Sequence, residues 1–284
     1  MDAWSQGTIV TWDTKPTKHE RLKAAMDAIG VGDLCPPPYS VGESLKRALQ
    51  VYARGHRSEL LRYMDRKTKI DLVVQRHEKA DDDGYEIVAI ERGKSRNSYT
   101  PICGARVVEG EAIEITEGYL DRGELVYDYR TNRATVAASA IGQMLVKVVQ
   151  LLHGTCVRSM GGLYYLPEGT VKEWEELCNA VEEPDGTQIT YYEIRLNASN
   201  MRAIGDAITK ELMEVSVGTL EEICDGELGK RALENREQAM AALRAKMLEY
   251  ESILDSPLQA VREALEKTET AIAMAKMAGV GAEA

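Results

Sequence analysis

One apolar stretch near the middle of the chain constrains the fold more than any other feature. Apolar residues between Thr131 and His153 would surround more than half of a helix, whereas a surface helix carries a single apolar stripe. The pattern therefore predicts a core helix over 131–153. Its apolar members are Val136, Ile141, Met144, Leu145, Val148, Val149, Leu151 and Leu152.

The segment after this helix predicts a turn and a short strand. Gly161 and Gly162 permit positive φ angles or a close backbone approach. Leu163–Leu166 has the composition of a strand, which Pro167 ends because proline cannot donate a ladder hydrogen bond. The sequence is mostly β in pattern before the central helix and mostly helical after it, so we expect the fold to be organised around this helix.

The N-terminal part predicts one strand and two helices. The expected elements are a strand over Thr8–Trp12 and helices over Lys18–Ile29 and Val41–Ala53. Thr17 is placed to cap the first helix, and Ser40 with Glu43 has capping-box spacing for the second. The 11-residue join between the helices is long for a helix-turn-helix motif, so a rigid spacer is the favoured interpretation.

From Glu59 to Tyr129 the apolar residues alternate with a period close to two, which is typical of strands. Turn-rich joins separate the runs, and short joins favour antiparallel pairing. We therefore expect a meander of about five or six antiparallel strands. The candidate strands are Leu60–Arg66, Lys69–His77, Tyr85–Arg92, Pro101–Val108, Ala112–Thr116 and Leu125–Tyr129.

The part after the central helix predicts a small α/β layer. A helix over Glu168–Val181, a strand over Gln188–Leu196 and a helix over Asn200–Val217 alternate in the order expected of such a layer. Asn197 or Ser199 is placed to cap the last of these helices.

These elements together indicate an α+β fold in three segments. The first, 1–130, holds the N-terminal helix pair and the antiparallel β meander. The second, 131–218, holds the central apolar helix and the small α/β layer. The third, 219–284, is a helical C-terminal arm.

Residues 219–276 predict a helical hairpin or a kinked arm. Apolar residues recur at alternating spacings of three and four, as in a coiled-coil seam. Asp255–Pro257 interrupts the seam, and Pro257 suits the first turn of a new helix. The seam requires a cover, which the protein body, the second arm helix or another chain would provide. Its residues, predicted as an interface, are Leu233, Met240, Leu243, Met247, Tyr250, Leu254, Leu258, Val261 and Leu265.

The chain is acidic overall, yet its first quarter is basic. The net charge is -11, but the first 79 residues carry 14 Lys and Arg against 10 Asp and Glu. Cations with Tyr52 and Tyr63 between them have the composition of a nucleic-acid contact. Carboxylates such as Glu59 and Asp65 interrupt the run, so a solvated face of mixed charge is at least as good an interpretation. The predicted contact residues are Lys46, Arg47, Arg54, Arg57, Arg62, Arg66, Lys67 and Lys69.

No pattern of residues predicts catalysis, a metal or a cofactor. Gly226–Lys230 lacks the preceding strand, the spacing and the Ser or Thr of a phosphate-binding loop. The four histidines are scattered, and the Asp81–Asp83 run is expected to be solvated at a hairpin tip. Cys156 lies near His153, but no orienting carboxylate lies close in sequence, so a buried structural cysteine is expected. We therefore expect no enzyme activity, no cofactor and no metal.

Cysteine usage and hydropathy predict a folded cytoplasmic protein. The five cysteines are odd in number, widely spaced and without a Cys-x-x-Cys pair, as expected in a reducing compartment. The sequence has no uncharged apolar run of about 18 or more residues, and its N-terminus lacks the pattern of a secretion signal. We expect no membrane partner.

A short motif resembles an uncharacterised family of accessory proteins from phages and other mobile elements. In that family a glycine pair and an aromatic strand ending in proline follow a long helix, as in Arg158–Pro167 here. The resemblance covers about residues 40–250 and implies an accessory protein of viral or mobile-element origin. It transfers no catalytic residues.

Three hypotheses of function follow in order. The first is a non-enzymatic accessory protein that self-assembles into a homo-oligomer or docks on a protein partner through its helical C-terminal arm. The second is a nucleic-acid-binding protein, for single- or double-stranded DNA, that uses the basic first quarter. The third is an enzyme whose site is assembled only by folding.

Overall fold

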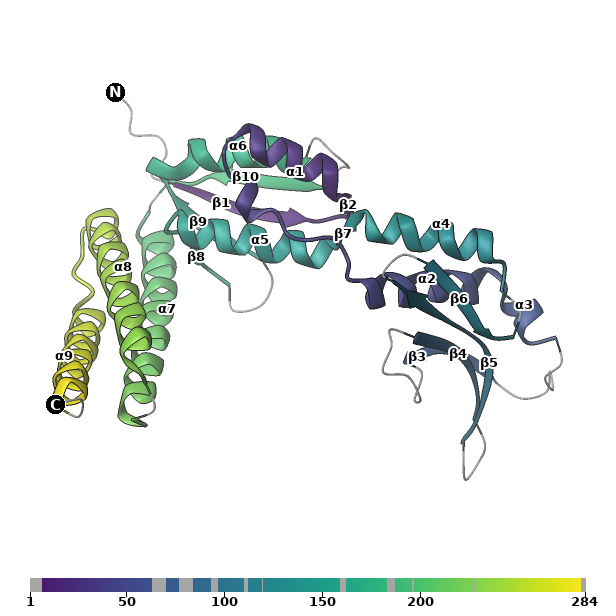
Figure 1. Cartoon of the computed structure of the whole chain (residues 1–284). Coiled ribbons are helices and arrows are strands. Elements are labelled where there is room, and N and C mark those ends of the chain that lie inside the picture. The colour runs from purple at the N-terminus through teal and green to yellow at the C-terminus, as the bar shows by residue number, and fades with distance from the viewer. Residues whose placement is uncertain are drawn as a thin grey trace. The chain divides into compact units, whose positions relative to one another are not determined.

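The structure is a computed structural model that describes residues 7–62, 70–76, 84–92, 97–109, 112–118, 120–158, 162–182, 187–195, 197–226 and 228–281. The chain divides into two compact units, each built from segments that are distant in sequence (Figure 1). Unit 1 comprises Met1–Asp13, Leu145–Asn179 and Thr187–Ala284, and unit 2 comprises Thr14–Met144 and Ala180–Gly186. The segment predicted over 219–284 lies wholly in unit 1, whereas the other two predicted segments are distributed over both units.

Unit 2 contains a four-stranded antiparallel sheet whose strands follow one another in chain order. The strands are β3 (Ile70–Arg76), β4 (Gly84–Arg92), β5 (Asn97–Val108) and β6 (Ala112–Glu117). The predicted meander is therefore confirmed for these strands. Strands that follow one another in the sequence also lie side by side in the sheet, an arrangement that antiparallel pairing allows with short connections.

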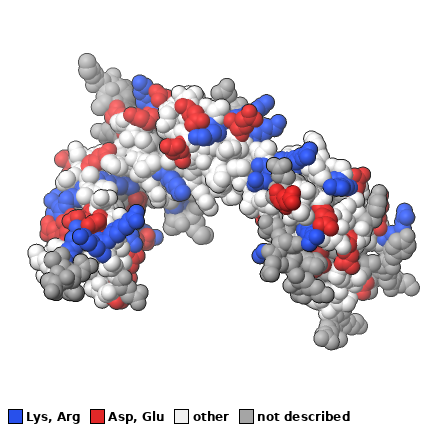
Figure 2. All heavy atoms as spheres, viewed as in Figure 1, with Lys and Arg blue, Asp and Glu red and all other residues white. Residues whose placement is uncertain are grey.

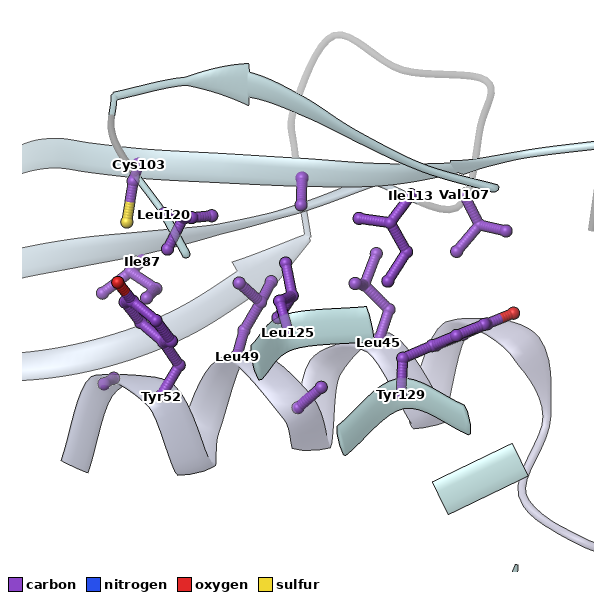
Figure 3. Close-up of a cluster of buried hydrophobic side chains, with 13 residues drawn as sticks. Leu45, Leu49, Tyr52, Ile87, Cys103, Val107, Ile113, Leu120, Leu125 and Tyr129 are labelled. Atoms are coloured by element: carbon purple, nitrogen blue, oxygen red, sulfur yellow. The ribbon is translucent and has the colours of Figure 1, made fainter. Parts of the chain in front are cut away.

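Helix α2 (Val41–Gly55) packs on one face of this sheet, and α4 (Arg122–Arg133) packs beside α2. Figure 3 shows side chains of both helices and of the strands pointing toward one another. Leu49, Leu125 and Ile87 are fully buried there, and each buried aliphatic side chain contributes about 1.5–3 kcal/mol. The Ser40 hydroxyl accepts a hydrogen bond from the Glu43 N–H at 3.3 Å, as expected for the helix cap.

Two predicted strands of unit 2 are wrong. Leu125–Tyr129 lies inside α4, which begins where the Asp121 carboxylate accepts hydrogen bonds from the N–H groups of Gly123 and Glu124. Leu125 and Tyr129 are four residues apart, a spacing that buries both on one helix face. The strand predicted over Leu60–Arg66 is wrong at its start, because Leu60 belongs to the short helix α3 (Arg57–Leu60) and a turn follows at Leu61 and Arg62; residues 63–66 lie outside the described residues.

The central helix is shorter than predicted. Helix α5 (Ala138–Leu151) begins seven residues after Thr131, because β7 (Thr135–Val136) intervenes and pairs with β2 (Thr17–Lys18). β-branched residues favour extended backbone, and the pairing supplies backbone partners that a continuous helix would remove. Thr17 belongs to β2 and does not cap α1 (His19–Ala28). A single 3-10 turn, Gly32–Leu34, follows α1.

Unit 1 contains a second antiparallel sheet, in which the first strand of the chain occupies an inner position. The order is β10 (Gln188–Glu193), β1 (Gly7–Asp13), β9 (Tyr164–Pro167) and β8 (Thr155–Cys156). After β9 follow the turn Glu168–Thr170 and helix α6 (Val171–Glu182). Trp12 of β1 stacks on Tyr164 of β9, with ring centroids 4.9 Å apart, and contacts Trp174 of α6 at 5.8 Å.

The C-terminal part of unit 1 is a three-helix arrangement of α7 (Ala198–Cys224), α8 (Lys230–Leu254) and α9 (Gln259–Gly281), visible side by side in Figure 1. The Asn197 side chain caps α7 by accepting a hydrogen bond from the Asn200 N–H at 2.9 Å. Asp255, with a φ of 47°, ends α8 where the predicted break lies. The predicted α+β fold with a helical C-terminal region is therefore confirmed.

Candidate functional site

A groove in unit 1 has both apolar and polar side chains on its walls. It has a volume of about 630 Å³ and lies between the end of α5, the turn into β8, and the first half of α7. We call it the α5–α7 groove. Its walls are Val146, Val149, Gln150, Gly154, Cys156, Val157, Tyr164, Ala203, Asp206, Ala207, Lys210, Glu211 and Glu214.

The groove has an apolar floor and a charged rim. Val146, Val149, Tyr164 and Ala207 are apolar and at least partly buried, and we call them the floor; Ala203, a second small residue of α7, is exposed. The rim residues Asp206, Lys210 and Glu214 follow one another along α7 and are 79%, 64% and 68% exposed. The two carboxylates of the rim form long ion pairs with cations of the same helix: 4.0 Å between Asp206 and Arg202, and 3.8 Å between Glu214 and Lys210. Such exposed pairs contribute little, so both rim carboxylates can take another cationic partner.

One wall of the groove is held by a buried lysine. The Lys246 ammonium on α8 donates to the Glu211 carboxylate at 2.6 Å and to the Gly154 carbonyl at 2.8 Å. The Thr155 hydroxyl donates to the other oxygen of Glu211 at 2.6 Å. We call Lys246, Glu211 and Thr155 the lysine brace. It joins α7, α8 and the start of β8, and its hydrogen bonds compensate the cost of burying charge.

Two further residues of α8 also hold the turn before β8. The Tyr250 hydroxyl donates to the His153 carbonyl at 2.9 Å, and His153 Nδ1 lies 2.5 Å from a Glu249 carboxylate oxygen. His153 has a φ of 56°, in the left-handed region that non-glycine residues rarely adopt. Next to it, a Cβ at Gly154 would lie 2.5 Å from Val149 and 2.8 Å from Leu166. The turn therefore requires glycine at this position.

Burial keeps the tyrosines behind the groove protonated. Desolvation raises the pKa of Tyr250, whose ring meets Tyr165 edge to face at 6.0 Å, and the carboxylates of Glu211 and Glu249 raise it further. Desolvation also raises the pKa of Tyr165. The Tyr250 hydroxyl therefore remains a hydrogen-bond donor, which its contact with the His153 carbonyl requires.

Two of the polar side chains that line the groove, Glu211 and Cys156, are engaged with other groups of the chain, and Cys156 is exposed where the sequence predicted a buried cysteine. Glu211 accepts from Lys246 and Thr155, and the exposed Cys156 thiol donates to the Arg158 carbonyl at 3.0 Å. The arrangement fixes the shape of a concave surface, which suits binding.

The comparison with known proteins identifies a family. A model of a family of unknown function, DUF6744, matches residues 7–279, which include both units. The chain belongs to this family. No curated protein matches it, and no solved structure matches it.

Over the ranges that the structure describes, no group of three or more His, Cys, Asp or Glu side chains is arranged to hold a metal ion. None of the helices in those same ranges combines the length and the apolarity that crossing a bilayer requires.

The basic residues predicted for nucleic acid are partly engaged within unit 2. Lys46 and Arg47 lie 3.8 Å and 3.0 Å from Glu43 carboxylate oxygens, and the Arg47 guanidinium stacks on the Tyr39 ring at 4.2 Å. Arg57 donates a hydrogen bond to the Ile70 carbonyl. Figure 2 shows Lys and Arg interspersed with Asp and Glu on the face drawn.

Two of the predicted cations extend into solvent. Arg54, at the end of α2, and Arg62, just after α3, are both exposed. Arg66, Lys67 and Lys69 lie outside the described residues. The structure therefore brings five of the predicted cations onto or near α2 and α3 without gathering them into one uninterrupted basic surface.

The predicted seam residues of the arm are covered by the same chain. Leu233, Met240, Met247, Tyr250, Leu254, Val261 and Leu265 are 0–6% exposed, and Leu243 and Leu258 are half-buried. The cover comes from α7, which extends seven residues beyond its predicted end at Val217 and contributes Ile204, Ile208 and Leu212. The sequence left open whether the protein body, the second arm helix or another chain covers the seam. In the structure the cover comes from the same chain, so the seam residues form part of a hydrophobic core.

The lysine brace was not predicted from the sequence. Its members are 35 and 56 residues apart along the chain, and pairing at such distances leaves no local pattern. One signal was present: Lys246 stands three residues after Leu243 and four before Tyr250, on the apolar stripe of α8. A lysine on such a stripe indicates a buried cation that needs a carboxylate partner.

Proposed function

We propose that this DUF6744 protein is a non-enzymatic accessory protein that docks a segment of a partner protein in the α5–α7 groove. The observation that carries the proposal is the combination of an apolar floor with a charged rim that includes the carboxylates of Asp206 and Glu214, in a groove of about 630 Å³. The docking role predicted for the arm passes to this groove because the arm's own seam is buried. Such a role fits the phage or mobile-element accessory type that the sequence motif resembles.

The chemistry of the groove suggests the chemistry of the partner segment. Apolar side chains would displace water from Val146, Val149 and Ala207, which provides the main driving force. A lysine or arginine flanking them would approach Asp206 and Glu214, whose present ion pairs are long and exposed. We therefore expect a segment that combines small or medium apolar residues with at least one cation.

The lysine brace supports this function by holding the groove wall in place before a partner arrives. Binding is weaker when a loop must be ordered at the moment of association, because the entropy of ordering opposes it. Lys246 and Glu211 fix the Gly154 turn in the unbound chain. Loss of the brace should therefore weaken docking even though Lys246 is too buried to touch a partner.

The test selects peptides on the full chain and then challenges them with a blocked groove. A displayed library of 12-residue peptides is the probe, and selected sequences should combine apolar residues with Lys or Arg. Ala207→Arg fills the floor and should abolish their binding, whereas Ala242→Arg, the same change at an exposed position of α8, should leave it unchanged. Peptides that bind the Ala207→Arg variant as well as the wild type would remove the proposal, as would a selection that enriches none.

Binding of DNA remains a second candidate function, supported by the exposure of Arg54 and Arg62 on neighbouring elements of unit 2. Lysines and arginines that extend into solvent neutralise phosphates and release counterions, which makes such binding sensitive to salt. The engagement of Lys46, Arg47 and Arg57 with groups of their own chain favours the docking role over this alternative.

A further inference from the structure

Strand β3 is an edge of the unit 2 sheet (Figure 1) and lacks most of the features that protect an edge. It pairs with β4 over residues 70–76 without a register shift, so no β-bulge interrupts this pairing. The strand has neither proline nor lysine. Its middle residues, Leu72, Val73 and Val74, are apolar, and Val73 is 40% exposed. Regular edges of this kind are templates for another strand.

One contact shows which backbone groups of β3 point away from the sheet. The Ile70 carbonyl accepts a hydrogen bond from the Arg57 guanidinium, so the backbone groups of Ile70 point away from β4. Backbone groups of successive strand residues point in alternate directions. The N–H and C=O groups of Leu72 and Val74 therefore point outward as well.

The pairing on the other side of β4 has the same phase. Pro101 of β5 lies opposite Val88 of β4, and proline has no N–H to donate, so this pair is the kind without hydrogen bonds. Val88 therefore bonds to β3, where its partner is Val73. Leu72 and Val74, on either side of Val73, then face outward, in agreement with the first contact. In the part of the chain that the structure describes, no hydrogen bond reaches the outward groups of these two residues.

Two exposed cations lie at the ends of this edge. Arg57 lies beside Ile70 at one end, and Arg76 is the last residue of β3 at the other. Among the described residues, neither guanidinium forms an ion pair with a carboxylate. The one carboxylate of the strand, Asp71, is already paired with Arg92 at 2.7 Å. The edge therefore combines an apolar middle with a cation at each end.

We propose that β3 binds an extended segment of a partner protein, with apolar residues in its middle and an aspartate or glutamate at each end. The segment adds to the sheet as a further strand, and its backbone pairs with the outward groups of Leu72 and Val74. Its carboxylates approach Arg57 and Arg76. The site lies in unit 2 and is independent of the α5–α7 groove of unit 1, whose rim carboxylates favour a cation.

A second copy of the chain fits this edge less well than an acidic segment. Antiparallel pairing of two β3 strands around Val73 would place Arg76 of the second copy opposite Ile70, beside Arg57. Guanidinium groups would then approach each other at both ends of the pairing, and like charges across a strand pair are destabilising. Charge therefore favours a partner that carries carboxylates.

Peptides with charged ends test the charge preference. The probes are labelled Glu-Val-Thr-Val-Thr-Val-Glu and the same peptide with lysine at both ends, titrated on the full chain by fluorescence anisotropy. We expect the Glu-ended peptide to bind at least about fivefold more tightly at low salt, because two exposed ion pairs form instead of two repulsions. Equal affinities overturn the proposal, as does a lack of binding up to about 500 µM, the range to search for an interface of one short strand.

Methylated peptides test the backbone pairing. Successive N–H groups of a strand point in alternate directions, so methyl groups on every second nitrogen of the Glu-ended peptide block one side of it. Two such peptides, methylated in opposite phases, should differ: the one blocked on the side that faces β3 loses binding, and the other retains it. Equal behaviour of the two peptides overturns the proposal.

Variants of the chain locate the site. Val74→Pro removes one outward N–H, and Arg76→Glu reverses one end charge; each should weaken the Glu-ended peptide by about fivefold to tenfold, with circular dichroism confirming the fold. Arg130→Glu, the same charge change at an exposed position of α4, should leave binding unchanged. Ala207→Arg, which fills the α5–α7 groove, should also leave it unchanged. Weakening by Ala207→Arg, or none by Arg76→Glu, would place the peptide elsewhere and overturn the proposal.

Sedimentation tests the competing occupant. We expect the full chain to have the same mean mass as Val74→Pro at every concentration. A dimer of the unmodified chain that Val74→Pro dissociates would show that a second copy occupies the edge, against the proposal.

Discussion

The ammonium group of Lys246 lies 2.6 Å from the carboxylate of Glu211, although the lysine side chain is only 7% exposed. Desolvating two charges costs several kcal/mol per ion, which close geometry and additional hydrogen bonds offset. Those bonds join the ion pair to the Gly154 carbonyl and the Thr155 hydroxyl, so the pair, together with the bond from the Tyr250 hydroxyl to His153, fixes the turn between α5 and β8. The turn and β8 contribute Gly154, Cys156 and Val157 to the groove wall.

Replacing the buried cation should destabilise unit 1. Lys246→Met keeps the length of the side chain but leaves the Glu211 charge without its partner. We expect a loss of about 3 kcal/mol, at the low end for a broken buried pair because Glu211 is 31% exposed. Urea denaturation followed by circular dichroism measures it. Lys210→Met, on an exposed position of α7, should change stability by less than about 0.5 kcal/mol; similar losses in the two variants would show that the brace is not stabilising.

Two glycine-to-alanine changes should alter the free energy of unfolding in opposite directions. At Gly154 the new methyl group would lie 2.5 Å from Val149 Cγ1, so Gly154→Ala should cost about 1–3 kcal/mol through overpacking. At Gly218, inside α7, no atom lies within 4 Å, and alanine should stabilise the helix by about 0.5–1 kcal/mol. Thermal unfolding of both variants checks the pair, and a tolerated alanine at 154 would contradict the packing described for the turn.

A histidine in unit 2 should make its stability depend on pH. Hydrogen bonds that the His56 ring donates to the carboxylates of Glu124 and then of Glu59 raise its pKa above the ordinary value of 6.5. Because the folded pKa is the higher one, protonated His56 contributes stability fully below 6.5 and loses that contribution as the pH rises through the folded value. The melting temperature of the wild type should therefore exceed that of His56→Gln at about pH 5.5, and the two melting temperatures should converge by about pH 8.5. A constant difference would point to packing instead.

Four of the five cysteine thiols should differ in reactivity according to their exposure. Burial, with a smaller contribution from Glu117, raises the pKa of Cys103 to about 12, so this thiol stays protonated and unreactive. Cys178 is also buried, whereas Cys156 and Cys224 are exposed. Ellman's reagent should modify the two exposed thiols rapidly and the two buried ones only after unfolding. Cys156→Ser should remove one rapid equivalent, and rapid modification of Cys103 in the folded chain would contradict its burial.

The DNA hypothesis makes a prediction that charge reversal can decide. If the exposed cations of the first quarter bind phosphates, Arg54→Glu with Arg62→Glu should weaken binding of a labelled oligonucleotide by at least about tenfold at low salt. Arg202→Glu, the same change at an exposed position of unit 1, serves as the control. Fluorescence anisotropy at two salt concentrations measures both effects. Binding that ignores salt, or that the control weakens equally, would remove the hypothesis.

Local signals allowed much of the fold to be predicted. The cap at Ser40, the cap at Asn197 and the break at Asp255 each depend on residues within one turn of the chain, and all are present. The meander was predictable because its neighbours in space are neighbours in sequence. The same approach failed at Leu125–Tyr129, where a spacing of four also fits a short strand and only the packing on α2 distinguishes a helix.

The candidate site was almost invisible in the sequence. Its walls come from α5, β8, β9 and α7, and its brace from α8 as well, so no short motif contains it. Gly154 and Cys156 are separated in the sequence only by Thr155, and neither a glycine nor a cysteine by itself indicates a groove. The apolar seam of the arm was conspicuous in the sequence, but its periodicity could not show whether the same chain or another one packs on it.

The sequence by itself determined the class of the fold, the caps and turns, and the apolar faces that must be buried, because these follow from interactions between residues a few positions apart. Tertiary structure alone decided which element covers each face. It placed β1 between β9 and β10, laid α7 over the seam of α8 and α9, and brought Lys246 to Glu211. Such choices depend on competition among distant surfaces of similar apolarity, which only the folded chain resolves.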